Sequence, residues 1–132
     1  MIVINLQIFG KDSGIRDDYE VGILTNEIYQ GWSGMKAREY KEFKGIRKES
    51  LRDNMSDLEV LLTDIGEVTT RELAKEHKLY GLKENKEIAR AGGEIANITR
   101  KEIESRLGKS VISKSNNISY QYKDENKKIE NK

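Results

Sequence analysis

Apolar positions recur with two different spacings along the chain, which predict a short extended segment followed by a set of helices. At the start of the chain, large apolar side chains occupy every second position: Ile2, Ile4, Leu6 and Ile8. This period of two is typical of a strand or of an extended docking arm. The glycine-bounded segment 10–14 then interrupts the pattern.

From residue 17 onward the apolar spacing changes to three and four residues, which indicates amphipathic helices. The first helix is predicted over 17–29 from apolar residues at helical spacing: Val21, Leu24 and Ile28. Gly31 and Gly34 are expected to end or bend this helix. Ser33 is then placed to cap a short helix that stops near Gly45.

The strongest helix-start signal is the segment 56–59, Ser-Asp-Leu-Glu, a capping box in which the Ser hydroxyl and the Glu carboxylate bond two backbone N–H groups. The helix that begins there runs to about His77, and its predicted core stripe is Leu58, Leu61, Leu62, Ile65 and Val68. A second long helix is predicted over 83–107, with Gly108 as its C-terminal stop. One face of this helix carries the residues expected to pack inward: Ile88, Ile95, Thr99, Ile103 and Leu107.

Gly92 and Gly93 lie inside the second long helix, where each glycine costs about 1 kcal/mol relative to alanine. Three interpretations stay open: a kink or break in the helix, close approach of another helix, and contact with a ligand or phosphate. The glycine pair joins the apolar arm in the set of candidate partner-binding residues, which comprises Ile4, Leu6, Ile8, Phe9, Gly92 and Gly93.

These patterns predict a mainly α protein, a small helical domain of four to five helices with a short N-terminal strand or arm. The arm is expected over 1–14, the helical domain over 15–113 and a polar tail over 114–132. The tail is too rich in Ser, Asn and Lys to pack well, and we expect 124–132 to be disordered. A charged fraction of 36% and a hydrophobic fraction of 36% suit helices with large exposed faces.

Several classes of chemistry are disfavoured by the composition. The chain has no Cys, which excludes disulfides, thiolate zinc sites and cysteine nucleophiles and favours a cytoplasmic setting. Its single histidine, His77, stands at a predicted helix end, and no glycine motif forms a phosphate cradle. We therefore expect no enzyme activity, no cofactor and no metal, with a carboxylate-only magnesium site as the residual alternative. No apolar run is long enough to span a membrane.

The charges are distributed unevenly between two neighbouring segments. Segment 36–52 holds seven Lys and Arg and three Glu, a net +4, whereas 57–76 holds six acidic and two basic residues, a net −4. Cations with interleaved aromatic rings suit a nucleic acid, so the candidate nucleic-acid-binding residues are Lys36, Arg38, Tyr40, Lys41, Lys44, Arg47, Lys48 and Arg52. Mutual neutralisation of the two segments and binding of a protein partner are the alternatives.

Residues 16–115 resemble the C-terminal region of DNA-damage-inducible protein D and of related phage and prophage proteins, which often carry it behind a Bro-type antirepressor domain. The resemblance rests on short motifs in the same order, among them Lys44-Gly45-Ile46-Arg47-Lys48, Met55-Ser56-Asp57-Leu58-Glu59 and Glu84-Asn85-Lys86 followed by Gly92-Gly93. It implies modulation of recombinase filaments on single-stranded DNA during the damage response, and it brings no catalytic residues. The Bro-type domain is missing from this sequence.

A second resemblance concerns the start of the chain, where residues 4–10 read Ile-Asn-Leu-Gln-Ile-Phe-Gly. This segment is similar to the opening of many phage capsid and head-morphogenesis proteins. The leading hypothesis is a phage or mobile-element regulatory protein that binds a DNA-associated host or phage protein, or single-stranded DNA. The alternative is a phage structural or morphogenesis factor that binds protein only, such as a virion protein. Assembly with further copies of the chain is a third option.

Overall fold

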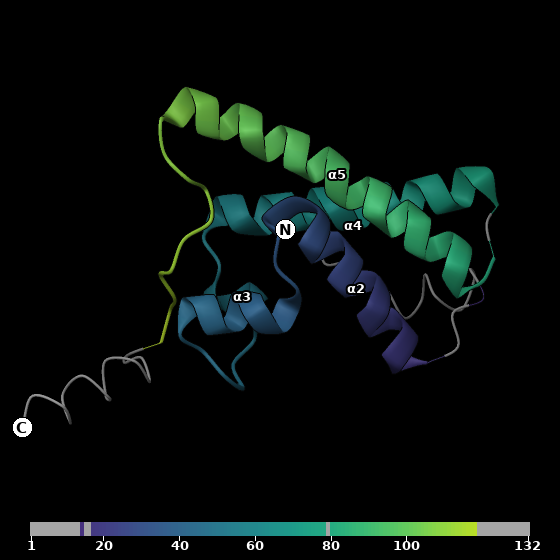
Figure 1. Cartoon of the computed structure of the whole chain (residues 1–132), viewed down its shortest axis with the longest axis horizontal. Helices are drawn as coiled ribbons and strands as arrows, with labels where there is room; N and C mark the ends of the chain where they lie inside the picture. Colours follow the sequence, from purple (N-terminus) through teal and green to yellow (C-terminus); the bar gives the residue numbers. More distant parts are fainter. Residues whose placement is uncertain (1–13, 15–16, 79, 119–132) are drawn as a thin grey trace, which may run out of the picture.

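The structure, a computed structural model, describes residue 14 and residues 17–78 and 80–118 (Figure 1). This part of the chain is mainly α, as predicted, and contains no strand. Its elements are α2 (Asp18–Ser33), α3 (Ala37–Lys44), the 3₁₀ turn η1 (Arg52–Asn54), α4 (Asp57–His77) and α5 (Leu82–Leu107). None of these helices combines the length and the apolarity that crossing a membrane requires. The predicted arm, apart from Gly14, and residues 119–132 of the predicted tail lie outside the described residues.

Most helix ends follow the local signals in the sequence. Ser56 and Glu59 form the predicted capping box, in which the Glu59 N–H donates to Ser56 Oγ at 3.3 Å and the Ser56 N–H donates to Glu59 Oε1 at 3.0 Å. Gly45 and Gly108 end α3 and α5 in the left-handed backbone region, as predicted. The expectation for Ser33 is wrong, because α2 runs through this residue and Lys36 takes the capping position of α3.

Close helix packing explains the glycines inside the helices. A Cβ on Gly93 would lie 2.9 Å from Gly31 Cα on α2, and a Cβ on Gly92 would lie 2.7 Å from the Gly66 carbonyl oxygen on α4. The interpretation as close approach of another helix is therefore confirmed, and α5 continues through the glycines without a break. Gly92 and Gly93 are buried within the protein, so their assignment as partner-binding residues is wrong.

The buried faces of α4 and α5 differ from the predicted stripes. The buried positions of α5 carry small or polar residues, namely Asn85, Ala89, Gly92, Gly93 and Ala96. The buried positions of α4 are Glu59, Leu62, Thr63, Gly66, Glu67, Thr70 and Ala74. Leu61, Ile95 and Leu107, all expected to be core, are exposed. Backbones that approach each other this closely leave no room for large side chains between them, so these side chains point outward.

The segment after α5 packs against the helices, contrary to the expectation for a polar tail that begins at residue 114. Figure 1 shows it descending from the end of α5 past the start of α4 towards α3. The Asn116 side-chain amide donates to the Lys44 carbonyl at 2.7 Å, and the Asn117 amide donates to the Asp53 carbonyl at 2.6 Å. Ile118 packs against the hydrophobic core, so the packed domain extends at least to this residue. The two asparagine side chains satisfy backbone carbonyl groups that would otherwise be unpaired.

Candidate functional site

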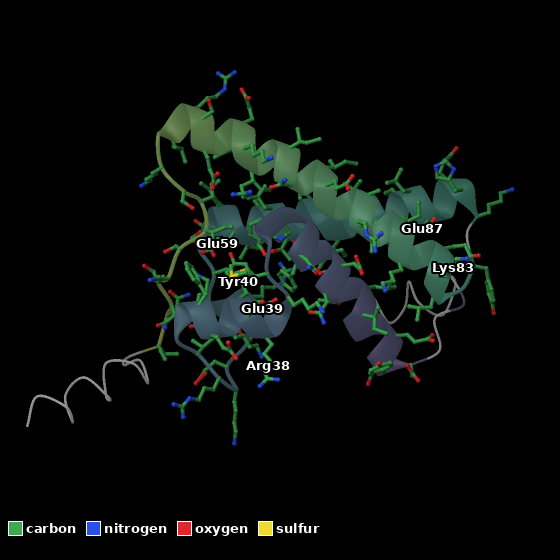
Figure 2. All side chains as sticks on the ribbon, in the orientation of Figure 1. Arg38, Glu39, Tyr40, Glu59, Lys83 and Glu87 are labelled. Atoms are coloured by element: carbon green, nitrogen blue, oxygen red, sulfur yellow. The ribbon has the colours of Figure 1, made fainter. Side chains whose placement is uncertain are left out.

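The predicted nucleic-acid-binding residues divide between the interior and the surface because α3 is amphipathic. Its inward face carries Tyr40 and Lys44, which are fully buried against α4. Figure 2 shows Tyr40 and Glu59 between α3 and α4, whereas Arg38 lies on the outer side of α3. The helix therefore removes two of the eight candidates from contact with any nucleic acid.

Lys44, the last residue of α3, is held in a buried network of hydrogen bonds. Its ammonium group lies 2.9 Å from Glu59 Oε1 and also donates to the carbonyl oxygens of Ser113 and Ser115, both at 2.7 Å. The Tyr40 hydroxyl donates to Glu59 Oε2, and burial together with this bond raises the pKa of Tyr40 far above its ordinary value. Both residues thus tie α3, α4 and the C-terminal segment together, and their assignment to a nucleic-acid site is wrong.

Arg52 also points towards the acidic helix rather than to solvent. Its guanidinium donates to Asp64 Oδ1 at 2.8 Å and to Glu67 Oε2 at 3.1 Å. Arg52 and Lys44 come from the basic segment, and their three carboxylate partners come from the acidic segment. For these two cations the alternative of mutual neutralisation is confirmed, and Arg52 is not an open nucleic-acid contact.

The Glu67 carboxyl group makes the stability of the fold sensitive to pH. Burial raises its pKa to about 7, Arg52 opposes the shift and Asp64 adds to it. A carboxyl group whose pKa is higher in the folded state favours folding when it is protonated. Its contribution should therefore be lost as the pH rises from about 4.5 to about 7, by roughly 3 kcal/mol in total.

Glu67→Gln removes this titration, so its free energy of unfolding should change less than that of the wild type between pH 5 and pH 8. Urea denaturation at a series of pH values measures the difference. The exposed Glu72 on the same helix gives a matched control, since Glu72→Gln should keep the wild-type slope. If the free energy of unfolding changed equally with pH in wild type and Glu67→Gln, the raised pKa of Glu67 would be contradicted.

Five of the predicted cations remain accessible and define what we call the α3 surface: Lys36, Arg38, Lys41, Arg47 and Lys48. Three glutamates of the same segment reduce its net charge from +5 to +2, and Arg38 Nε lies 3.6 Å from Glu42. Lys114 from the C-terminal segment extends the surface, with its ammonium group 5.6 Å from the centre of the Phe43 ring. The α3 surface is a modest cationic area with a partly accessible aromatic ring, which suits weak contact with phosphates.

A second surface, which includes Leu61, Ile65 and Ile95 of the predicted core, lies along the antiparallel pair α4 and α5. Leu61, Ile95 and Ile98 are 48%, 41% and 69% exposed, and Ile65 is half-buried. Because Gly66 packs against Gly92 and Ala96, the antiparallel register places Leu61 level with Ile98 and Ile65 level with Ile95. These four residues define what we call the α4–α5 face.

The α4–α5 face lies on the side of the helix pair away from α2. On α5, Gly93 faces α2 and Gly92 faces α4. Going round the helix from Gly93 to Gly92 and onward, helical periodicity reaches Ile95 and then Ile98, so both isoleucines lie on the side away from α2. A signal in the sequence could have revealed this orientation. The stripe of Ala89, Gly92, Gly93 and Ala96 marks a close-packing side, and the isoleucines stand on another side.

A cavity of about 560 Å³ lies at the end of the helix pair where α4 begins and α5 ends. Its apolar lining comes from Leu58, Leu107, Val111 and Ile112, and its polar rim includes Ser56 and Lys109. Leu58 stands one helical turn before Leu61, so the cavity adjoins the α4–α5 face.

The remaining candidates do not gather into a site for catalysis. His77 is exposed at the end of α4, and among the described residues no three metal-binding side chains lie close enough to hold a metal ion. Comparison of the chain with models of protein families, with curated proteins and with solved structures found no match. The α3 surface and the α4–α5 face are therefore the two features on which a function can be argued.

Proposed function

We propose that this protein is a regulatory protein of a phage or mobile element that binds a protein assembled on DNA. The α4–α5 face is its docking surface, and the α3 surface contacts the nucleic acid beside the docked protein. The observation that carries the proposal is the set of large aliphatic side chains exposed together at Leu61, Ile95 and Ile98. Contiguous exposed apolar surface of this kind marks interaction sites on proteins.

Two further features support a partner that is associated with DNA. The α3 surface keeps a net positive charge after the internal ion pairs of Lys44 and Arg52 are formed. Figure 1 shows α4 between α3 and α5, so the cationic and apolar surfaces lie on different sides of one helix. The resemblance to the C-terminal region of DNA-damage-inducible protein D points to a recombinase filament on single-stranded DNA as the partner.

The double variant Leu61→Asp/Ile98→Asp should weaken binding to a bacterial recombinase filament on single-stranded DNA by at least about tenfold. Each substitution places a charge where an apolar contact is proposed, and central apolar contacts of interfaces commonly contribute more than about 1 kcal/mol. Fluorescence anisotropy of the labelled protein measures the affinity. Tyr19→Asp is the matched control, because Tyr19 is 78% exposed on α2 and should tolerate the change. Equal affinities of wild type and double variant would contradict the docking role.

Phosphate contacts of the α3 surface should appear in the salt dependence of binding to bare single-stranded DNA. Replacing Lys36, Arg47 and Lys48 with Glu should weaken this binding and make the slope of log K against log salt less negative by about 2, at about 0.7 for each lost contact. A control with the same change of charge replaces Lys75, Lys83 and Lys101, which are exposed on α4 and α5. Identical slopes for both triple variants would remove the nucleic-acid contact from the proposal.

The second candidate function is a phage structural or morphogenesis factor that binds protein only. It is favoured by the inward positions of Tyr40, Lys44 and Arg52, which leave the α3 surface with a small net charge. Under this alternative, charge reversal on α3 leaves partner binding unchanged and the protein shows no affinity for single-stranded DNA at low salt. The salt experiment therefore separates the two candidates.

A further inference from the structure

The outward apolar side chains of α4 and α5 follow the spacing of a coiled-coil seam. The α4 row is Leu58, Leu61, Ile65 and Val68, and the α5 row is Ile88, Ala91, Ile95 and Ile98. In both rows the steps are three, four and three residues, and every member is at least partly exposed. This alternation is that of the two seam positions of a heptad, which place apolar side chains against a neighbouring helix.

The two rows lie beside each other on the side of the helix pair that faces away from α2. The register that places Leu61 level with Ile98 also places Val68 level with Ala91. Two adjacent seams on one side of a helix pair form the surface against which a third helix packs in a bundle. Each row spans about 15 Å, so a helix of about three turns covers both rows.

The charged side chains on this side of the helix pair are predominantly acidic. Helical periodicity places five exposed glutamates next to the rows: Glu72, Glu76, Glu84, Glu87 and Glu102. The cation on this side is Arg106, whose Nε lies 2.8 Å from Glu102 Oε1. The nearby lysines stand roughly a quarter of a turn further round their helices, namely Lys75, Lys83 and Lys101.

Most of these glutamates gather where α4 ends and α5 begins, and Figure 2 shows Glu87 at this end of α5. Arg71 Nη2 lies 3.4 Å from Glu72, whereas Glu76, Glu84 and Glu87 form no ion pair with any residue that the structure describes. Their carboxylates are available to cations of a docked partner. A second copy of the chain would bring the same excess of glutamates from both sides, which opposes association.

We infer that the α4–α5 face takes one amphipathic α-helix of the partner, laid along both rows. The apolar residues of this helix recur at steps of three and four, and the lysines or arginines beside them pair with Glu76, Glu84 and Glu87. The inference rests on the proposed docking role of the face and names the element that docks there.

Three synthetic peptides of three heptads each test the inference on the full chain. The lysine peptide has leucine at both seam positions and lysine at the flanking positions, and the glutamate peptide has glutamate in place of each lysine. The third peptide has the composition of the lysine peptide, with its leucines at every second position. Like charges on both flanks oppose self-association of the first two peptides.

Fluorescence anisotropy of the labelled peptides measures their affinities for the protein. The lysine peptide should bind at least about tenfold more tightly than either of the other two, because it alone matches both the spacing and the charge of the face. Circular dichroism should show that this peptide gains helix when it binds.

Two variants of the protein locate the bound peptide. Leu61→Asp/Ile98→Asp should weaken binding of the lysine peptide by at least about tenfold, because it places charges in the middle of the rows. Glu76→Lys/Glu87→Lys should abolish the preference for the lysine peptide over the glutamate peptide.

The control variant Glu42→Lys/Asp53→Lys makes the same change of net charge at exposed positions of α3 and η1. It should keep the wild-type preference, and thermal denaturation verifies that all variants fold. Loss of the preference in the control as well would overturn the pairing with Glu76 and Glu87, because net charge alone would then explain it.

Equal affinity of the lysine peptide and either other peptide overturns the inference, as does absence of binding or equal binding by Leu61→Asp/Ile98→Asp. Sedimentation equilibrium gives one more outcome: a dimer that Leu61→Asp/Ile98→Asp abolishes identifies a second copy as the occupant and overturns the inference too. The peptide experiment contains no DNA and no recombinase, so its failure leaves filament binding intact. Failure of filament binding likewise leaves the peptide result intact.

Discussion

Lys44→Met should lower the free energy of unfolding by about 3–5 kcal/mol, because it leaves the buried carboxylate of Glu59 without its cation. The two side chains are both fully buried, and the Lys44 ammonium group is 2.9 Å from the carboxylate. The substitution also removes the donors to the Ser113 and Ser115 carbonyls and so loosens the C-terminal segment. A domain of this size has a total stability of about 5–15 kcal/mol, so the loss is a large fraction of the whole.

Urea denaturation of the single and double variants separates the ion pair from its surroundings. Lys44→Met/Glu59→Gln should be more stable than Lys44→Met alone, since the neutral amide leaves no unpaired buried charge. Its oxygen can accept from the Ser56 N–H, and its NH2 group can donate to the Tyr40 hydroxyl oxygen. Arg38→Met is the control on the same helix, because the Arg38 side chain is 92% exposed and its loss should cost less than about 0.5 kcal/mol. A loss below about 1 kcal/mol for Lys44→Met would show that the network is not needed for the fold.

Gly93→Ala should destabilise the protein by about 2 kcal/mol, although alanine is the better helix former. The added Cβ would lie 2.9 Å from both Gly31 Cα and the Ile28 carbonyl oxygen, and neither backbone atom can move without separating α2 from α5. Overpacking against backbone atoms that cannot move costs up to about 3 kcal/mol, which exceeds the gain of about 1 kcal/mol in helix propensity by about 2 kcal/mol.

The matched control for Gly93 is Gly22, which stands inside α2 with open space around the position of its missing Cβ. Gly22→Ala should stabilise the protein by up to about 1 kcal/mol. Thermal denaturation of both variants therefore tests opposite signs for the same chemical change. Stabilisation by Gly93→Ala would contradict the close contact between α2 and α5.

The helices could be predicted from the sequence because their signals are local. Ser56 and Glu59 specify a helix start through bonds within one turn, and Gly45 and Gly108 end helices through their own backbone conformation. The orientation of the helices is a tertiary property. The large apolar side chain of Ile95 predicts a buried position. The contact of Gly93 with Gly31 instead places the glycine side of α5 inward and leaves Ile95 exposed.

The candidate site was predicted less well, for a related physical reason. A lysine in a basic segment is normally exposed, so Lys44 was indistinguishable from its neighbours until α3 was placed against Glu59. Arg52 was misassigned in the same way, since its partners Asp64 and Glu67 stand twelve and fifteen residues away in the chain. The α4–α5 face was missed because Leu61 and Ile95 satisfy a helical pattern whether they are buried or exposed.

Docking of the α4–α5 face on a protein assembled on DNA can be tested with a photoreactive amino acid at position 98. The full chain carrying benzoylphenylalanine in place of Ile98 is irradiated with a recombinase filament on single-stranded DNA, beside a chain that carries the same group in place of Tyr19. We expect cross-links to the recombinase from position 98 and few or none from position 19. Cross-links from position 19 alone, or from neither position, would contradict this docking.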